Sequence, residues 1–376
     1  MGNALSQIAL DVYYKYYLWK AQNPEDIFYM TAAWNSHGLP YEKIYLEDVG
    51  TDPSYEDILK VAQKYISIAQ EEENCFVDYN LKPKKNYIEY YDTDEEYIEY
   101  CKDKIQYLYR EGFIKRKGEQ LFLRLDKAID LKSDLFINDI EFFPKHHKNS
   151  VLNILNTLNA DYPLSKERKF TFKIEIEGSV YSINPIFQSI LIPVFIREKY
   201  DMENLLEITG KGLVKGHYLM CAISTILNFK PPYKKVYMHG TVLGDDRKRM
   251  SKHSENVIRP SDLKGSRNFV RYVLLRTFSE KDKLVQLKKG RNEYRKIESK
   301  LDIILKYDFE IQDIDRTYLE KEMTRIYANL ENFKLENAIE IFYSFMKRVR
   351  IKETSNKIVD KEAKALKDLC RIFFIG

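Results

Sequence analysis

The stretch VYMHGTVLGDDRKRMSKHSENVIRP (236–260) joins an apolar run directly to a dense cluster of positive charge. Its first part belongs to KKVYMHGTVL (234–243), whose apolar and β-branched residues predict a strand. Its second part, RKRMSKHSENVIRP (247–260), groups basic side chains around a single Met-Ser pair. Most basic runs are solvated surface, so charge alone favours an exposed loop. The surrounding elements decide whether the run is instead a binding loop.

Helices and strands alternate before this strand. Apolar positions at helical spacing predict a helix in 4–20, and the apolar run IFYM (27–30) has the length of a strand. The alternating pattern of KFTFKIEIEGSVYSI (169–183), with its Glu-Gly turn, predicts a β-hairpin. Helical periodicity returns in three further stretches, 55–69, 95–114 and 213–227. From Leu263 onward we find helical periodicity and no strand signal.

The order of these elements predicts an α/β fold. We expect a Rossmann-type domain with a parallel sheet in residues 1–262, a small connecting insertion at about 80–164, and an all-α bundle in residues 263–376. In doubly wound sheets, ligands bind outside the carboxyl ends of the strands. The loops after the predicted strands at 27–30 and 234–243 should therefore face one crevice. The basic run lies in the second of these loops.

The 376-residue chain has the composition of a globular protein. It is 44% hydrophobic and 31% charged, with a net charge of +4. No stretch approaches the ~18 consecutive apolar residues that a membrane span needs. The N-terminal MGNALSQIAL lacks the basic and small-residue features of a secretory signal, so the cytoplasm is the expected compartment. Its first six residues also fit a short pattern for N-terminal myristoylation.

The cysteines and the charges restrict the possible partners. The four cysteines are far apart and form no C-x-x-C pair, which argues against a zinc site and a disulfide framework and predicts buried thiols. Residues 71–111 contain 12 acidic and 6 basic residues, whereas residues 247–300 contain 17 basic and 6 acidic residues. We therefore expect the later region to contact a polyanionic partner.

Five stretches carry motifs that occur together, in this order, in one family. They are GNALSQIALDVYYKYYLW (2–19), WNSHGLPYE (34–42), IEFFPKHHKNSVLNILNTLNADYPLSKERKF (140–170), TGKGLVKGHYL (209–219) and VYMHGTVLGDDRKRMSKHSENVIRP (236–260). The chain thereby resembles the class I aminoacyl-tRNA synthetases of the isoleucine, valine, leucine and methionine subgroup. The last stretch is similar to that family's mobile KMSKS loop, and 328–346 resembles a shortened anticodon-binding bundle.

The resemblance implies ATP-dependent activation of an amino acid or carboxylic acid and its transfer to tRNA, with ATP and Mg²⁺ as cofactors. Lys252 matches the second lysine of KMSKS and Arg249 replaces the first, keeping the charge, and these two are the implied catalytic residues. The implied ATP-binding residues are Gly2, Asn3, Gly210, Gly212, His217, His239, Met250, Ser251 and Lys252. The implied amino-acid site consists of Trp34, Asn35, His37 and Gly38, and the implied tRNA contacts are Lys166 and Arg168.

The chain departs from the family pattern at several of these positions. The chain begins within the HIGH motif, so that Gly2-Asn3 aligns with its last two letters and Asn3 stands in place of the final histidine. Both HIGH histidines are therefore missing. Gly212 stands where the family has an Asp for the ribose, and Asn35 where an Asp meets the substrate ammonium. The connecting insertion lacks the family's zinc-binding cysteines, and residues 43–163 have no room for an editing domain.

These departures leave three hypotheses about what the chain does. The retained Met250-Ser251-Lys252 favours a divergent synthetase that still activates a substrate. Loss of one transition-state donor typically costs about 3 kcal/mol, so loss of two imidazoles favours an inactive paralogue that binds tRNA or regulates. The start within the HIGH motif also fits a truncated copy.

Several residues also have ordinary structural interpretations. His217 lies in an apolar helix and could be a buried, hydrogen-bonded core histidine or a pocket residue. Trp34 is more typical of a core. We expect His146 and His147 to be exposed, and the Asp11–Lys15 pair to support only its own helix. The oligomeric state is not predicted by the sequence.

Overall fold

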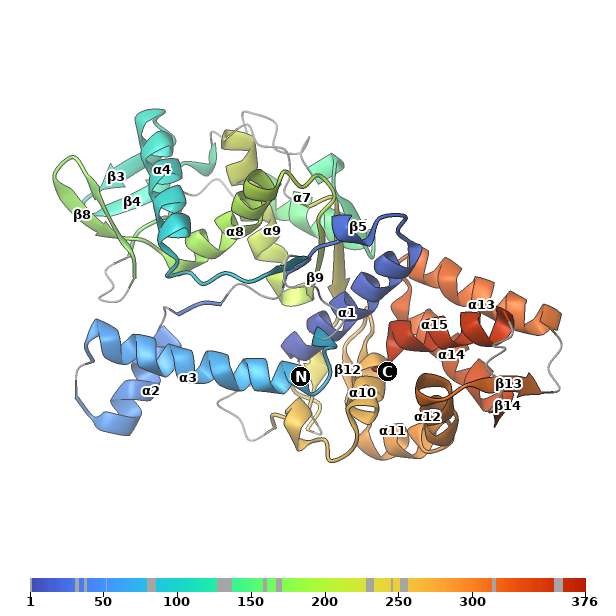
Figure 1. Ribbon diagram of the computed structural model, residues 1–376. Helices are drawn as coiled ribbons and strands as arrows, with labels where there is room; N and C mark the ends of the chain where they lie inside the picture. The colour runs from blue at the N-terminus through green and yellow to red at the C-terminus, as the bar shows by residue number, and fades with distance from the viewer. Residues whose placement is uncertain are drawn as a thin grey trace.

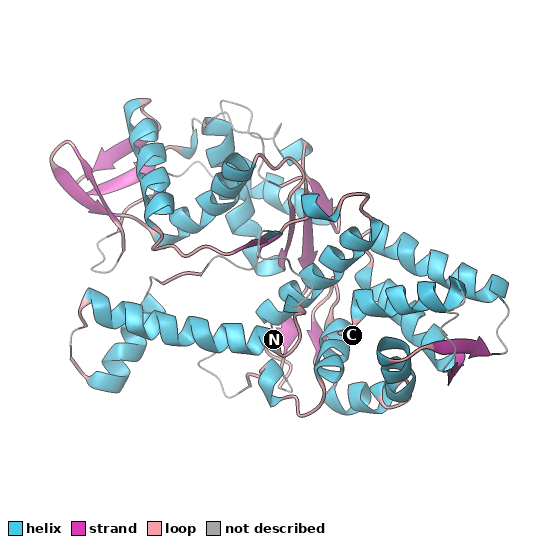
Figure 2. Cartoon of the chain, in the orientation of Figure 1, coloured by secondary structure: helices cyan, strands magenta, loops and turns pink. Residues whose placement is uncertain are grey.

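The structure is a computed structural model. It describes residues 2–30, 34–36, 39–51, 53–79, 86–126, 137–157, 161–166, 171–227, 233–244, 246–250, 256–312, 316–354 and 361–376. Figure 1 shows the order of the elements, and Figure 2 shows that helices dominate the C-terminal part while strands are concentrated before it. The predicted α/β fold, followed by a helical region, is confirmed.

A parallel sheet lies at the centre of the first part. Strand β10 (Lys235–His239) pairs in parallel with β9 (Leu206–Gly210) on one side and with β5 (Glu141–Phe143) on the other. A second parallel pair joins β1 (Tyr29–Met30) to β2 (Tyr87–Ile88), and a bridge between Trp34 and Tyr91 continues it. The predicted strand at 234–243 is thus the central strand, and its carboxyl end leads into the basic run.

Four helices pack around this sheet. Helix α1 (Gly2–Lys20) contacts β9, and α7 (His146–Thr157) contacts β5 and α9 (Val214–Ile226). Helix α8 (Pro185–Tyr200) packs on α9 and is almost entirely apolar along its middle turns. Helices α2 (Leu39–Val49) and α3 (Tyr55–Asn74) form a hairpin that extends away from the sheet (Figure 1).

The connecting insertion is a small α+β unit. Helix α4 (Glu95–Arg110) leads into an antiparallel sheet of β3 (Ile114–Lys117), β4 (Gln120–Leu123) and β6 (Tyr162–Pro163). The predicted hairpin is present as β7 (Lys173–Ile176) and β8 (Ser179–Ser182). Glu177 and Gly178 at its turn have φ of 51° and 73°, the left-handed conformation that suits the twist of a two-residue hairpin.

The C-terminal region is helical, with two small strand pairs that the sequence did not predict. Its helices are α10 (Arg267–Thr277), α11 (Leu287–Tyr294), α12 (Glu298–Lys306), α13 (Arg316–Glu331), α14 (Leu335–Arg348) and α15 (Lys361–Phe373). Strands β13 (Phe309–Gln312) and β14 (Arg350–Glu353) pair in antiparallel, and β12 (Lys283–Leu284) pairs with β11 (Val242–Leu243). These strands have two to four residues, which is too short for an alternating pattern to stand out between helical ones.

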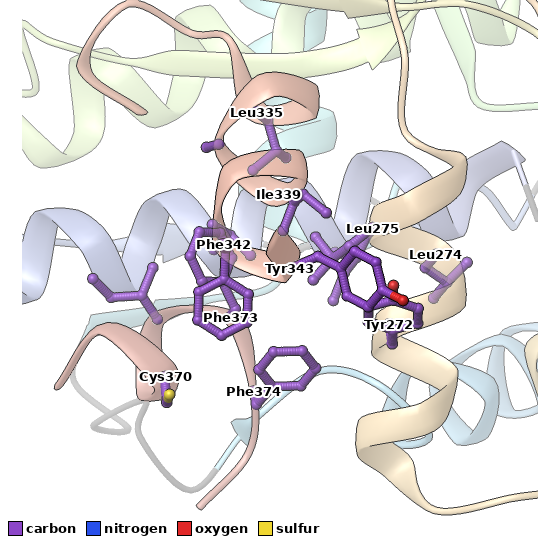
Figure 3. Packing of buried hydrophobic residues seen from close by; sticks show 14 of the residues in the cluster. Tyr272, Leu274, Leu275, Leu335, Ile339, Phe342, Tyr343, Cys370, Phe373 and Phe374 are labelled. Carbon is purple, nitrogen blue, oxygen red and sulfur yellow. The ribbon is translucent and has the colours of Figure 1, made fainter. Parts of the chain in front are cut away.

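Two hydrophobic clusters form the core. One combines α1 with α10 to α15, and Figure 3 shows Tyr272, Phe342, Phe373 and Phe374 packed at its centre. The other combines the insertion with α8 and α9. The first cluster crosses the proposed boundary at residue 262, and the division into domains remains a prediction. Cys101, Cys221 and Cys370 are buried free thiols, as predicted, whereas Cys75 is only half-buried, so the prediction is wrong for that residue. Among the described helices, none combines the length and hydropathy that a bilayer span requires.

A buried ionic network ties the first helix to the last. Arg271 of α10 is fully buried, and its Nη1 lies 2.6 Å from Oδ2 of Asp11 in α1. Arg271 Nε donates to the carbonyl of Phe373 at 2.7 Å. Lys15 Nζ lies 3.5 Å from Asp11, 3.4 Å from Asp78, and donates to Phe374 O at 3.0 Å. The prediction that Asp11 and Lys15 support only their own helix is therefore wrong, because both belong to a long-range network.

Replacing Arg271 with Met should destabilise the protein by about 3–5 kcal/mol, because Asp11 would remain as a buried charge with less compensation. Urea denaturation followed by circular dichroism measures this. Lys20→Met is the control, because it breaks an ion pair with Glu331 whose side chains are 51% and 47% exposed. Its cost should be below about 1 kcal/mol. Equal effects of the two substitutions would contradict the assigned importance of the buried network.

The network also makes stability depend on pH. Burial and the nearby Arg271 charge lower the pKa of Lys15 to about 8, although Asp11 and Asp78 oppose the shift. Between this pKa and the ordinary value of 10.5, the unfolded chain binds more protons at Lys15 than the folded chain does, so folding gains stability as pH rises. The stability of wild type relative to Lys15→Met should rise by on the order of 2 kcal/mol between pH 8 and pH 10. A relative stability independent of pH would contradict this.

Candidate active site

Two glycines form the turn at the carboxyl end of β9. The strand ends at Gly210, a short 3₁₀ turn (Lys211–Leu213) follows, and α9 begins directly after it. A Cβ atom on Gly210 would lie 3.4 Å from Cε1 of His239, and one on Gly212 would lie 4.0 Å from Nη2 of Arg249. Four of the residues predicted for the ATP and catalytic sites therefore converge at the carboxyl ends of β9 and β10.

His239 connects this turn to the first helix. Its Nε2 lies 2.9 Å from Ser6 Oγ, and its Nδ1 lies 2.8 Å from the carbonyl oxygen of Gly240. Burial lowers the pKa of His239, which favours the neutral ring near pH 7. The carbonyl can only accept, so Nδ1 carries the proton and Nε2 accepts from Ser6. The first turn of α1, with Gly2 and the exposed Asn3, is thus held beside the strand ends, and its unbonded N–H groups carry partial positive charge.

The loop after α10 fixes the turn that follows β10. Gly240 donates its N–H to Ser279 O at 2.7 Å, and a Cβ atom there would lie only 2.2 Å from the carbonyl oxygen of Lys281. Asp282 Oδ1 accepts from the N–H of Thr241 at 2.7 Å and lies 2.6 Å from Lys211 Nζ. Residues 279–283 therefore link the turn after β9 to the turn after β10.

The basic run has a fixed base. Asn256 Nδ2 donates to both carboxylate oxygens of Asp246, at 3.1 and 3.0 Å, and contacts Arg249 O at 3.3 Å. Bonds from the Lys248 N–H and from Asn256 hold the pKa of Asp246 below its usual value. Met250 packs against the first hydrophobic cluster. Ser251 and Lys252 lie outside the described residues, whereas Arg249, two residues before Ser251, lies beside Gly212.

The histidines differ in their surroundings. His217 is buried, with Nδ1 3.1 Å from Leu213 O and Nε2 bonded to Glu207. Burial lowers its pKa, but the Glu207 carboxylate outweighs this and the pKa of His217 is raised. Both ring nitrogens are thus used, as in a core histidine. His146 is exposed as predicted, whereas His147 is only 6% exposed because α7 turns it toward α9.

The predicted amino-acid end lies at the carboxyl ends of β1 and β2. Trp34 is 9% exposed and donates from Nε1 to Glu89 Oε1 at 2.6 Å, consistent with a core position. Asn35 is exposed, and its Oδ1 accepts from Ser189 Oγ at 3.1 Å. His37 and Gly38 lie outside the described residues. Of the two predicted tRNA contacts, Lys166 is exposed beside the β7–β8 hairpin, and Arg168 lies outside the described residues.

Sequence reasoning missed residues that hold the site together. Ser6 connects the first helix to His239, Asp282 links the two turns, and Asn256 holds the base of the basic run. Their sequence contexts are ordinary polar loop and helix positions, so only their long-range partners reveal their roles. A cavity of about 160 Å³ lies elsewhere, between α10, α11 and α14, with Arg276, Glu293 and Glu340 among its lining residues, and none of the predicted site residues lines it.

Comparisons with known proteins agree with the fold described above. Residues 207–288 match the family model of class I tRNA synthetases for isoleucine, leucine, methionine and valine. Two structures of Mycobacterium tuberculosis methionyl-tRNA synthetase with methionyl-adenylate match with TM-scores of 0.68 and 0.71, each at 13% identity. Each match covers 99% of this chain and 85% of the other chain. No curated protein sequence matches. The resemblance to class I synthetases of this subgroup and the Rossmann-type fold are confirmed.

Replacing Asn256 with Ala should loosen the base of the basic run, since it removes the contacts to Asp246 and Arg249. Each such bond contributes about 1 kcal/mol, so amide hydrogen exchange in residues 246–250 should accelerate about tenfold or more. Mass spectrometry of exchanged peptides measures this. Asn332→Ala is the control, because its Nδ2 donates to Ala328 O in the last turns of α13 and not to the basic run. Unchanged exchange in 246–250 would show that Asn256 does not hold the base.

Proposed function

We propose that this chain binds ATP and activates a small amino acid or carboxylic acid as an acyl-adenylate, for transfer to tRNA. One observation carries the proposal: Gly210, Gly212, His239 and Arg249 converge with the start of α1 at the carboxyl ends of parallel strands. A doubly wound sheet binds ligands at such a position. The match over 207–288 covers all four of these residues and the whole basic run.

The reaction needs positioning and charge neutralisation more than covalent help from the protein. The substrate carboxylate would attack the α-phosphate, and pyrophosphate would leave. Arg249 and Lys252 would supply positive charge to the phosphates, and Met250 would anchor the loop to the core. The N–H groups at the start of α1, near Gly2 and Asn3, would face the nucleotide. The glycines at 210 and 212 would leave room for its close approach.

Magnesium fits this site as a counter-ion that arrives with the nucleotide. The described residues contain no group of three or more His, Cys, Asp or Glu side chains arranged for a metal ion. Mg²⁺ is commonly held by substrate phosphates and water with few protein ligands. When bound, it would neutralise phosphate charge. The prediction that the chain has no zinc site remains a prediction.

The proposed acceptor and location follow from charge and family. Residues 247–300 carry an excess of basic residues, and Lys166 is exposed beside the β7–β8 hairpin, so tRNA would lie across both. We assign the chain to the cytoplasm. In this proposal, the nucleotide domain occupies residues 1–262 and a helical, anticodon-binding-like domain occupies residues 263–376.

A second function is favoured by the functional side chains that the site lacks at two positions. Asn3 provides no imidazole at the start of α1, and Gly212 has no carboxylate for a ribose. A chain that keeps the tRNA surface but does not form adenylate would act as a tRNA-binding or regulatory module. The two functions share one fold and differ in whether pyrophosphate exchange occurs.

ATP–pyrophosphate exchange, measured with each of the twenty amino acids, tests the first function. Exchange above background should occur with at least one of them. Lys252→Ala should reduce it about 100-fold, because one phosphate-stabilising group typically contributes that much. Lys306→Ala, on the surface of α12, is the control and should leave exchange unchanged. Absence of exchange with every amino acid would contradict the proposed activation of an amino acid.

Filter binding of total tRNA at several salt concentrations tests the second function. The logarithm of the binding constant should fall with the logarithm of salt concentration with a slope of about −3 or steeper, since several phosphates are neutralised. Binding with this slope but without exchange would favour the inactive paralogue. Binding that is absent or insensitive to salt would remove tRNA as the partner.

A further inference from the structure

The amino-acid end of the proposed site contains a carboxylate that sequence reasoning did not name. Asp92 follows β2 (Tyr87–Ile88), and its backbone N–H donates to Trp34 O at 3.0 Å, which extends the parallel β1–β2 pair. Its Oδ1 accepts from the N–H of Ser36 at 2.7 Å. The carboxylate therefore lies at the carboxyl end of this pair, beside the residue that follows Asn35.

An amino-acid substrate brings an ammonium group, which needs a counter-charge where it leaves water. Asn35 cannot supply that charge, because its side chain is a neutral carboxamide. Its Oδ1 already accepts from Ser189 Oγ, and its amide N–H groups are donors that an ammonium would avoid. A carboxylate adjacent to Asn35 is the chemical group that fits this requirement.

Asp92 is fixed in place for such a role. It is only 1% exposed, and its carbonyl oxygen accepts from Gln188 Nε2 of α8 at 2.6 Å. Gln188 and Ser189 are adjacent, so α8 holds Asp92 and Asn35 from the same turn. The pKa values of Tyr41 and Tyr55 are raised, chiefly by burial and secondly by the negative charge of Asp92. The Asp92 carboxylate therefore acts electrostatically on both phenols. Tyr41 also donates to Asn35 O at 3.0 Å.

We propose that Asp92 is the specificity-determining carboxylate that receives the ammonium of the amino-acid substrate, in place of a carboxylate at position 35. This inference rests on the proposed function and deepens it, because it selects amino acids over carboxylic acids that lack an amine. Charge-assisted hydrogen bonds are about twice as strong as neutral ones, so the amine should increase affinity by about 10- to 100-fold.

The test compares two probes that differ only in the amine. Glycyl sulfamoyl adenosine and acetyl sulfamoyl adenosine mimic an acyl-adenylate, carry no side chain that a pocket could reject, and need no catalysis. Isothermal titration calorimetry with the full chain should show that the glycyl probe binds at least about tenfold more tightly. Asp92→Asn should weaken the glycyl probe about tenfold or more and leave the acetyl probe unchanged. ATP binding should also be unchanged.

Three further variants keep the test sharp. Asp94→Asn makes the same charge change two residues away and should leave the preference intact. Asn35→Asp, combined with Asp92→Asn, should restore it. Asp92→Ser keeps an acceptor for the Ser36 N–H and replaces Asp92→Asn if that variant does not fold. Equal affinity of wild type for both probes, or a preference that survives loss of the Asp92 charge, would overturn the inference. If neither ATP nor the probes bind to wild type, the proposed function fails and the inference fails with it.

Discussion

The ion pair between Arg271 and Asp11 is the constraint on which the rest of the structure depends. The guanidinium is fully buried and bonds to a carboxylate of the first helix and to a main-chain carbonyl near the end of the last helix. Because a buried charge is tolerated only with such partners, α1, α10 and the end of α15 have one compatible arrangement. The aromatic core around Phe342, Phe373 and Phe374 packs in that arrangement.

The position of α1 has consequences for the proposed site. The same helix that carries Asp11 carries Ser6, which bonds to His239 at the end of the central strand. The helix start is thereby placed beside the Gly210 turn. The loop after α10 continues the connection, because Asp282 joins Thr241 to Lys211. Packing in the helical region thus reaches the proposed nucleotide end of the site through α1 and through one short loop.

Much of the fold could be predicted from local pattern. The helix at 4–20, the hairpin at 169–183 and the strand at 234–243 have clear periodicity, and each is present. The β13–β14 pair was missed because four residues of alternation do not differ enough from the neighbouring helical pattern. His147 was expected to be exposed, but which face of an amphipathic helix is covered depends on the neighbour that packs against it.

The sequence by itself determined the element types, the place of the basic run after the central strand, and the resemblance carried by five ordered stretches. Only the tertiary structure decided which polar residues act together. Asp11 and Arg271 are 260 positions apart, and Asn35 and Ser189 are 154 apart. Local periodicity reports the burial of a helix or strand face, whereas the partner of a charge is set by how distant elements pack. The role proposed for Asp92 beside Asn35 therefore becomes visible only when the strand ends are brought together in the fold.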